Sequence, residues 1–262
     1  MQKNNTESWH FGLDYCSQTL NWVPTDTEEC FNKSMTDPVR RSYLESMGWT
    51  DPEVISYQFN SHGFRCDEFD PGKSSIVTLG CSYTAGIGLP VDLIWPTLVG
   101  KSLGLTVYNI SGGGYAADTC YRLGRYWIPK LQPKVVCILM PPRRRVELVI
   151  DPLYRKHKDP LVDTYGTYST QLDTVNVKTD FFLKNWMTAR ENSDLNLEKN
   201  KLAIESIAKQ TNAKFVCLVA DELPSINNGK LVKFARDFVH PGPIGQQMLA
   251  DEFLKILYEQ AI

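Results

Sequence analysis

Four short runs of apolar residues, separated by segments with helical periodicity, most constrain what this chain can fold into. The runs cover 74–80, 105–110, 134–140 and 214–220. The candidate helices cover 92–104, 116–132, 195–212 and 243–262. Strands that are apolar on both faces must be covered by helices on both sides. The alternation therefore predicts an α/β fold with a mainly parallel sheet, arranged as a three-layer α/β/α sandwich.

Two stretches stand outside this alternation. Residues 1–70 are rich in aromatic and polar residues and lack clean periodicity, apart from a short helix predicted over 37–48. Residues 143–195 combine mixed charges, two Asp-Pro pairs and a stretch rich in Thr, Tyr and Ser. This second stretch is either an insertion with its own small hairpin or a lid on the substrate side. We therefore expect an N-terminal extension, 1–70, that wraps a core domain, 71–262, with an insertion at about 143–195.

The composition argues against several classes of function. Apolar residues make up 42 % and charged residues 22 % of the chain, which suits a globular core. A net charge of −2 and a pI of about 6.1 disfavour a nucleic-acid partner. The chain lacks an apolar stretch long enough to cross a membrane, and its N-terminus lacks the apolar core of a signal peptide, so we expect a cytoplasmic protein with no membrane partner. The oligomeric state stays open.

The cysteines and histidines give poor support for a metal site. The seven cysteines are odd in number, and the sequence holds no C-x-x-C and only four histidines. Cys137 and Cys217 lie within apolar runs, where a thiol behaves as a small hydrophobic side chain. We therefore expect reduced cysteines and no structural zinc.

The loops after the predicted strands carry the residue types of an acyl-transfer site. In open parallel sheets, ligands bind where the carboxyl ends of the strands meet the following loops. Ser82 follows the first strand, and Asp237 and His240 follow the fourth. A serine hydroxyl becomes a nucleophile when an imidazole removes its proton, and a carboxylate orients that imidazole and stabilises its cation. The three-residue spacing lets the Asp237 carboxylate meet Nδ1 of His240 while Nε2 points outward.

The other two loops supply candidate donors to a developing oxyanion. The backbone N–H of Ser82 is one candidate, and an N–H of the glycine run, at Gly113 or Gly114, is another. After the third strand stand Arg143, Arg144 and Arg145. These arginines either donate to the oxyanion, bind an anionic substrate, or are solvated or paired for structural reasons.

Each candidate also has a simpler interpretation. Gly-x-Ser is most often only a turn, and Cys81 is either a structural thiol or, instead of Ser82, the nucleophile. Asp237 could cap the last helix. The glycine run could be a flexible turn. Only the combination of the loops favours a catalytic site.

Several blocks of the sequence, in order and at suitable distances, resemble those of the SGNH (GDSL-like) hydrolases. "GCSYTAGIGLP" is similar to the first block, Gly-Asp-Ser-x-x-x-Gly, and "IWPTLV" to the Trp-Pro helix that often follows it. In "YNISGGG", Asn109 begins the turn of the second block and Gly114 matches its oxyanion glycine. "DFVHPGPIGQQMLA" resembles the last block, Asp-x-x-His-Pro, and "YQFNSHGFRCDEF" a lead-in to the first. The resemblance covers roughly 57–142 and 196–260.

The resemblance implies a flavodoxin-like α/β/α fold with Ser82 as nucleophile, His240 as general base and Asp237 as its partner. It implies hydrolysis or transfer of acyl esters, often acetyl groups on sugars or other small alcohols, without a metal or other cofactor. We therefore expect a small-molecule or carbohydrate ester as substrate.

The sequence departs from the family pattern in two places. Cys81 stands where the family has the aspartate before its serine. "LMPPRRRVE" has no asparagine where the third block, Gly-x-Asn-Asp, supplies one to the oxyanion hole. Losing one such donor costs about 10²–10³ in rate. The chain is therefore a serine esterase, a binding or assembly module that kept the scaffold without activity, or an acyltransferase with the same triad.

Overall fold

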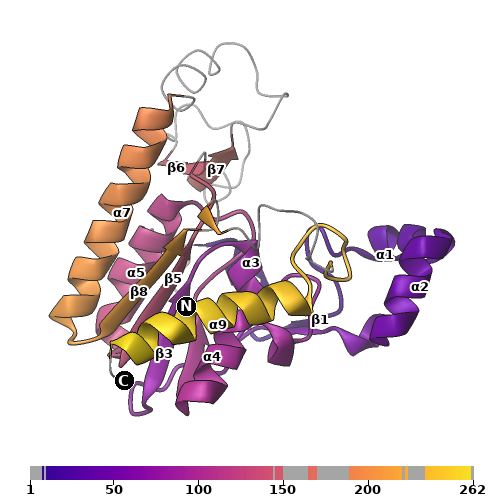
Figure 1. Cartoon of the computed structure of the whole chain (residues 1–262), viewed down its shortest axis with the longest axis horizontal. Coiled ribbons are helices and arrows are strands. Elements are labelled where there is room, and N and C mark those ends of the chain that lie inside the picture. The colour runs from indigo at the N-terminus through magenta and orange to yellow at the C-terminus, as the bar shows by residue number, and fades with distance from the viewer. Residues whose placement is uncertain are drawn as a thin grey trace.

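A four-stranded parallel sheet forms the centre of the molecule, in the order β4–β3–β5–β8 (Figure 1). The computed structural model describes residues 8, 10–143, 145–149, 165–169, 189–219, 222–223 and 234–260. The strands are β3 (Ser75–Leu79), β4 (Thr106–Asn109), β5 (Val135–Met140) and β8 (Lys214–Val219). Each coincides with one of the four apolar runs. In register, Val77 of β3 lies between Tyr108 of β4 and Val136 of β5.

Helices cover both faces of this sheet (Figure 1). The side chains along each central strand pack alternately against one helical layer and the other. The helices are α4 (Trp95–Leu103) and α9 (Pro243–Glu259) on one face, and α5 (Ala117–Leu131) and α7 (Arg190–Gln210) on the other. Ile76 packs with the α4 and α9 side chains, whereas its neighbour Val77 packs with those of α5 and α7. The predicted three-layer α/β/α class with a mainly parallel sheet is therefore confirmed.

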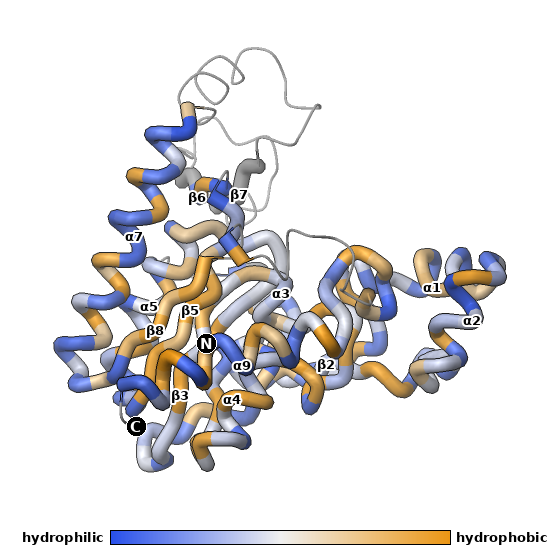
Figure 2. The backbone as a smooth tube through the Cα atoms, viewed as in Figure 1, coloured by the Kyte–Doolittle hydropathy of each residue, from blue (hydrophilic) through white to orange (hydrophobic). Residues whose placement is uncertain are grey.

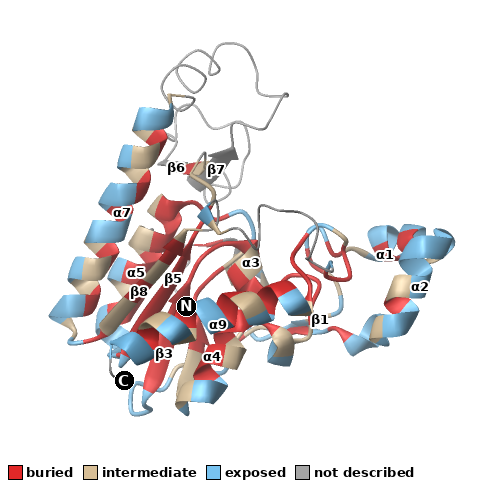
Figure 3. Ribbon diagram, in the orientation of Figure 1, coloured by how far each residue is buried: buried red, intermediate tan, exposed pale blue. Residues whose placement is uncertain are grey.

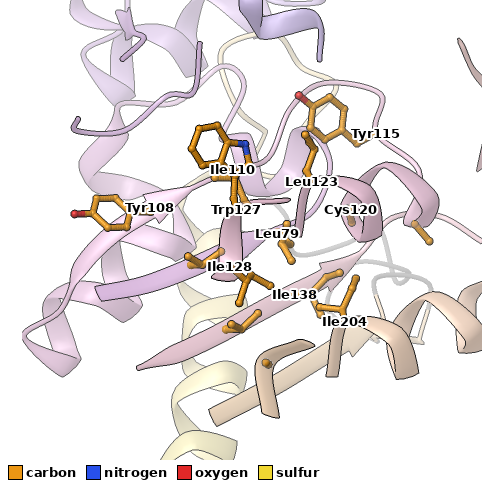
Figure 4. Close-up of a cluster of buried hydrophobic side chains, with 14 of the residues drawn as sticks. Leu79, Tyr108, Ile110, Tyr115, Cys120, Leu123, Trp127, Ile128, Ile138 and Ile204 are labelled. Carbon is orange, nitrogen blue, oxygen red and sulfur yellow. The ribbon is translucent and has the colours of Figure 1, made fainter. Parts of the chain in front are cut away.

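The burial pattern matches this layering. All residues of β3 and β5 are buried, and both strands are strongly apolar (Figures 2 and 3). Figure 4 shows the cluster between the sheet and the second helical layer, where Leu79 and Ile138 of the sheet meet Leu123 and Ile128 of α5 and Ile204 of α7. Helix α7 keeps an exposed outer side (Figure 3).

Two of the helices begin at other residues than predicted. Helix α4 begins at Trp95 and not at Asp92, which lies instead in the preceding 3₁₀ turn η3 (Val91–Leu93). Pro96 occupies the first turn of α4, where its missing N–H and fixed φ are tolerated. Helix α7 begins at Arg190, ahead of the apolar residues on which its prediction was based.

The N-terminal part of the chain forms small elements that pack against the loop after β3. They are η1 (Phe11–Tyr15), β1 (Thr19–Leu20), α1 (Glu28–Thr36), α2 (Pro38–Met47), η2 (Pro52–Val54) and β2 (Tyr57–Gln58). Strands β1 and β2 pair antiparallel. The predicted helix is α2, whereas α1 was not predicted because its apolar side chains are few. Phe31, Leu44 and Trp49 of this part share an apolar cluster with Ile87 and Leu89 of the loop.

Within 143–195, the structure describes two paired antiparallel strands, β6 (Arg145–Val149) and β7 (Tyr165–Ser169). The residues between these strands and those from 170 to 188 lie outside the described residues. The division into an extension, a core and an insertion remains a prediction.

The structure also bears on disulfide bonds, metal sites and membrane-spanning helices. All seven cysteines are free thiols. In the described part of the chain, no group of three or more His, Cys, Asp or Glu side chains is placed to hold a metal ion. None of the helices found there combines the length and the apolar character needed to cross a bilayer.

His10, a buried neutral imidazole, attaches the turn η1 to the segment 62–64. Its Nδ1 accepts the N–H of Gly12 at 3.1 Å, and its Nε2 donates to the carbonyl of His62 at 3.0 Å. Its ring stacks on Phe64 with the centroids 4.0 Å apart. Burial lowers the pKa of His10 from 6.5 to about 3. Protonation therefore favours the unfolded chain wherever the pH lies below about 6.5.

This burial predicts an acid-dependent loss of stability. The contribution of neutral His10 is complete above pH 6.5 and falls by about 2 kcal/mol by pH 5. In His10→Gln, which cannot be protonated, we expect the free energy of unfolding to fall less steeply between pH 7.5 and pH 5. Urea unfolding of both proteins at the two pH values measures this difference. Equal losses in both proteins would contradict it.

Candidate active site

Ser82 is the first residue of α3 (Ser82–Ala85), a single helical turn that follows β3 almost directly. The side chain is nearly buried, with 7 % of its surface exposed. Gly86 ends the turn in the left-handed region, at φ 70°. Cys81 lies in the apolar cluster on the α5 side of the sheet and does not line the cavity that Ser82 faces. This placement disfavours the interpretation of Cys81 as the nucleophile.

Gly88 shows why the loop after Ser82 requires a glycine where it approaches residues 235–237. Its backbone is left-handed, at φ 77°, and its carbonyl accepts the N–H of Arg236 at 2.9 Å. A Cβ at this position would lie 2.8 Å from Cβ of Ala235 and 3.2 Å from the backbone nitrogen of Asp237. Only glycine allows this approach. The loop that carries Asp237 and His240 thereby lies directly against the loop that carries Ser82.

Asp237 and His240 form the contact that their spacing predicts. Nδ1 of His240 and Oδ2 of Asp237 are 2.5 Å apart. The other carboxylate oxygen, Oδ1, accepts the backbone N–H groups of Val239 at 3.0 Å and His240 at 3.1 Å. Phe238, between them, adopts a left-handed φ of 56°, which closes the turn. Because Gly242 is the N-cap of α9, Asp237 does not cap that helix.

The surroundings of Asp237 keep it ionised although it is buried. Burial by itself raises the pKa of this carboxyl group. The hydrogen bond and charge of His240, together with the two backbone N–H groups, outweigh burial and hold the pKa below its usual value. The pair thus presents a carboxylate to the imidazole, as general-base catalysis by His240 requires.

Ser82 and His240 line the same cavity, which has a volume of about 560 Å³. Two further contacts join the segments that carry them. The rings of His240 and Tyr83, the residue after Ser82, meet edge to face with centroids 5.7 Å apart. The side chain of Gln246 donates to the carbonyl of Tyr83 at 3.0 Å and accepts the N–H of Trp95 at 2.9 Å. The cavity walls also include Gly112, Gly113 and Gly114, as well as the aromatic residues Tyr15, Tyr57, Phe59 and Tyr115.

Asn109, which begins the second loop, has a structural role in this arrangement. Its Oδ1 accepts the hydroxyls of Thr78 at 3.1 Å and Ser111 at 2.5 Å. Its Nδ2 donates to the carbonyl of Thr84 at 2.9 Å. Asn109 therefore ties the glycine loop to the helical turn that begins at Ser82.

The three neighbouring arginines have different surroundings. Arg143 forms ion pairs with Asp194 and, at 2.7 Å, with Glu222, and it does not line the cavity. Arg144 lies outside the described residues. Arg145, the first residue of β6, lines the cavity, and its buried Nη1 has no hydrogen-bond partner among the described residues. An unpartnered buried donor carries a desolvation cost of about 1–3 kcal/mol or more, which a bound acceptor removes.

A buried charged cluster under the site was not predicted from the sequence. Nε and Nη2 of Arg236 donate to the two carboxylate oxygens of Asp26 at 3.0 and 2.7 Å, and each residue is only 1 % exposed. The Tyr57 hydroxyl donates to Asp26 at 2.5 Å and accepts the N–H of Gly88 at 2.8 Å. The cluster therefore joins the N-terminal part of the chain to both loops of the site. The residues of the ion pair stand 210 positions apart, and no local pattern indicates their pairing.

Arg65 is a second buried cation that the sequence does not reveal. Its guanidinium donates to the carbonyls of Ala85, Gly86 and Leu89 at 3.2, 2.7 and 2.8 Å, which fixes the loop after Ser82. It also lies over the ring of Tyr57, 4.3 Å from the centroid. Burial lowers the pKa of Arg65 only to about 10. Because this value is still well above 7, the side chain is charged at neutral pH.

Comparisons with known proteins find matches only among solved structures, at low sequence identity. No protein-family model matches the sequence, and no curated protein matches it. Among solved structures, TesA matches with 14 % identity and a TM-score of 0.44, over 70 % of this chain and 98 % of its own. The psychrotrophic esterase EstA from Pseudoalteromonas sp. matches with 14 % identity and a TM-score of 0.37, over 71 % and 98 %. An acetyl xylan esterase from Butyrivibrio proteoclasticus matches with 14 % identity and a TM-score of 0.38, over 71 % and 64 %.

Proposed function

We propose that the protein is an SGNH-type serine hydrolase that cleaves short acyl esters through an acyl-Ser82 intermediate. The observation that carries the proposal is the short contact of His240 with a buried, ionised Asp237, beside a cavity that Ser82 and His240 share. The ordered sequence blocks around these residues support the same proposal.

In the proposed reaction, Nε2 of His240 takes the proton of the Ser82 hydroxyl as Oγ attacks the ester carbonyl carbon. The backbone N–H of Ser82 and one from Gly112–Gly114 donate to the resulting oxyanion. His240 then gives its proton to the leaving alcohol as the carbon–oxygen bond breaks. A water molecule, deprotonated by His240, attacks the acyl-serine, and the proton returns to Oγ as the acid leaves.

The cavity supports a small ester as substrate. Its volume lies within the range of about 300–1,000 Å³ that is usual for small-molecule sites. Four aromatic side chains in its walls offer flat apolar surfaces on which a sugar ring or a short acyl chain packs. We therefore propose acetyl or similarly short esters of a carbohydrate or another small alcohol.

Covalent labelling with a fluorophosphonate tests the proposed function. We expect the probe to form one adduct, located at Ser82 by mass spectrometry of the digested protein. A protein that takes up no probe at neutral pH would contradict the proposal. That result would favour a non-catalytic binding module, the alternative raised by the absent oxyanion asparagine.

Arg145 is the proposed substitute for that asparagine. We expect Arg145→Ala to lower kcat/KM for neutral aryl esters by about 10²–10³-fold, because a charged donor near the developing oxyanion is lost. Arg143→Ala is the matched control, and we expect nearly unchanged rates because its side chain is paired with Asp194 and Glu222. Initial rates with a neutral ester and with a hemisuccinate ester measure both effects. A loss limited to the anionic ester would instead assign Arg145 to substrate binding, and unchanged rates with both would exclude both roles.

A further inference from the structure

A hydroxyl group from the N-terminal part of the chain contacts the same carboxylate oxygen as His240. Oγ1 of Thr25 donates to Oδ2 of Asp237 at 3.0 Å. The other groups that donate to this carboxylate, the His240 ring and the N–H groups of Val239 and His240, belong to its own turn. Thr25 is therefore the donor, among the described residues, that fixes the carboxylate to another part of the fold.

The backbone at Thr25 is held in a conformation that threonine normally avoids. Its φ is 77°, in the left-handed region, where a β-branched side chain is strained. Such strain persists only where the surroundings impose it, and it clusters at functional sites. Here the next residue, Asp26, is fixed by Arg236, and its carbonyl accepts the N–H of Val23 at 3.1 Å.

Two adjacent non-covalent contacts therefore join the segment 21–26 to the segment 236–237. Asp26 pairs with Arg236, and Thr25 bonds to Asp237, so that neighbours on one segment meet neighbours on the other. Nη2 of Arg236 also donates to the carbonyl of Asn21 at 2.9 Å. The ion pair of Asp26 with Arg236 fixes the position of the segment 21–26. The Thr25 hydroxyl, held in this way, fixes the orientation of the Asp237 carboxylate.

We infer that Thr25 is a positioning residue of the active site. The segment 21–26 then holds the Asp237 carboxylate in place, in addition to packing against the core. The inference rests on the proposed function. With Oδ1 held by its own turn and Oδ2 held by Thr25, the carboxylate cannot rotate away from Nδ1 of His240. Thr25 acts on the imidazole through Asp237 and takes no part in the bond changes.

Removing the hydroxyl while keeping the side-chain shape tests this inference. We expect Thr25→Val to lower kcat and the rate of fluorophosphonate labelling by about 10- to 100-fold with little change in KM, because small misplacements of catalytic groups have effects of this size. Thr25→Ser keeps the donor and should restore most of the rate. Thr27→Val is the matched control, because the Thr27 hydroxyl accepts the N–H of Cys30 at the start of α1 and does not contact the site.

A spectroscopic measurement separates this inference from the proposed function. The Nδ1 proton of His240, in its short contact with Asp237, should give a low-field proton NMR signal that is shifted or broadened in Thr25→Val and unchanged in Thr27→Val. This holds even if the wild type takes up no phosphonate. An unchanged signal, with unchanged labelling where the wild type reacts, would overturn the inference. If Thr25→Val fails to fold, Thr25→Gly decides the question, because it also lacks the donor and relieves the left-handed strain.

Discussion

Ser82→Ala is expected to lower kcat for ester hydrolysis by about 10⁴–10⁶-fold, the largest effect of any single substitution in the site. The alanine leaves the cavity, the backbone donors and the His240–Asp237 pair in place but removes the atom that forms the acyl intermediate. Initial rates with a short-chain aryl ester, measured for both proteins at the same pH, give this ratio. The thermal unfolding temperature should stay close to that of the wild type, because the substitution removes one hydroxyl at a cavity wall.

Cys81→Ala is the control for this substitution. Its thiol packs in the apolar cluster of the α5 layer, so we expect some loss of stability but a turnover close to that of the wild type. The opposite pattern, in which Ser82→Ala keeps its activity and Cys81→Ala loses it, would show that the thiol is the nucleophile. Equal activity in all three proteins would show that the hydrolysis comes from elsewhere.

Asp26→Asn is expected to lower the free energy of unfolding by about 3–5 kcal/mol, the largest stability effect of a conservative change. The substitution preserves the shape of the side chain and leaves the Arg236 guanidinium buried without its counter-charge. Urea unfolding at neutral pH measures the loss. Glu45→Gln is the control, because it breaks the exposed pair of Arg41 and Glu45, and exposed pairs are worth about 0–1 kcal/mol.

The double variant Asp26→Leu/Arg236→Met removes both charges of the same pair and tests whether the loss of stability comes from the unpaired ion. Replacing both charges with apolar side chains removes the unpaired buried ion. The free energy of unfolding should therefore be higher than that of Asp26→Asn. Activity should not recover, because the segment that holds Thr25 would lose its fixed attachment. If Asp26→Asn destabilised the protein no more than Glu45→Gln, the ion pair would have no special structural role.

The parts of the molecule that the sequence predicts are those with a local signal. The strands follow from apolar runs, and the contact of Asp237 with His240 follows from a three-residue spacing within one turn. Arg143 and Arg145 could not be told apart, because their roles depend on where β6 begins. Helix α1 was missed because only three of its nine residues, Cys30, Phe31 and Met35, are apolar.

The contacts that complete the site have no local signal at all. Thr25 and Asp237 stand 212 positions apart, and the hydroxyl of a threonine beside a proline suggests only a turn. Buried ion pairs such as that of Asp26 with Arg236 contradict the usual exposure of charged side chains, so the sequence alone favours a solvated surface for both. The structure locates them because it brings the two distant segments together.

The attachment of segment 21–26 to the loop 234–240 also determines when the site can form during synthesis. A ribosome releases the chain from its N-terminus, and domains begin to fold as they emerge. The central strands can pair early, but the partner of Asp26 emerges only after 210 further residues have been added. Nascent chains that stop short of Arg236 would thus hold all four strands of the central sheet without the partners of Asp26 and Thr25, and the active centre would assemble only after residues 236–240 emerge.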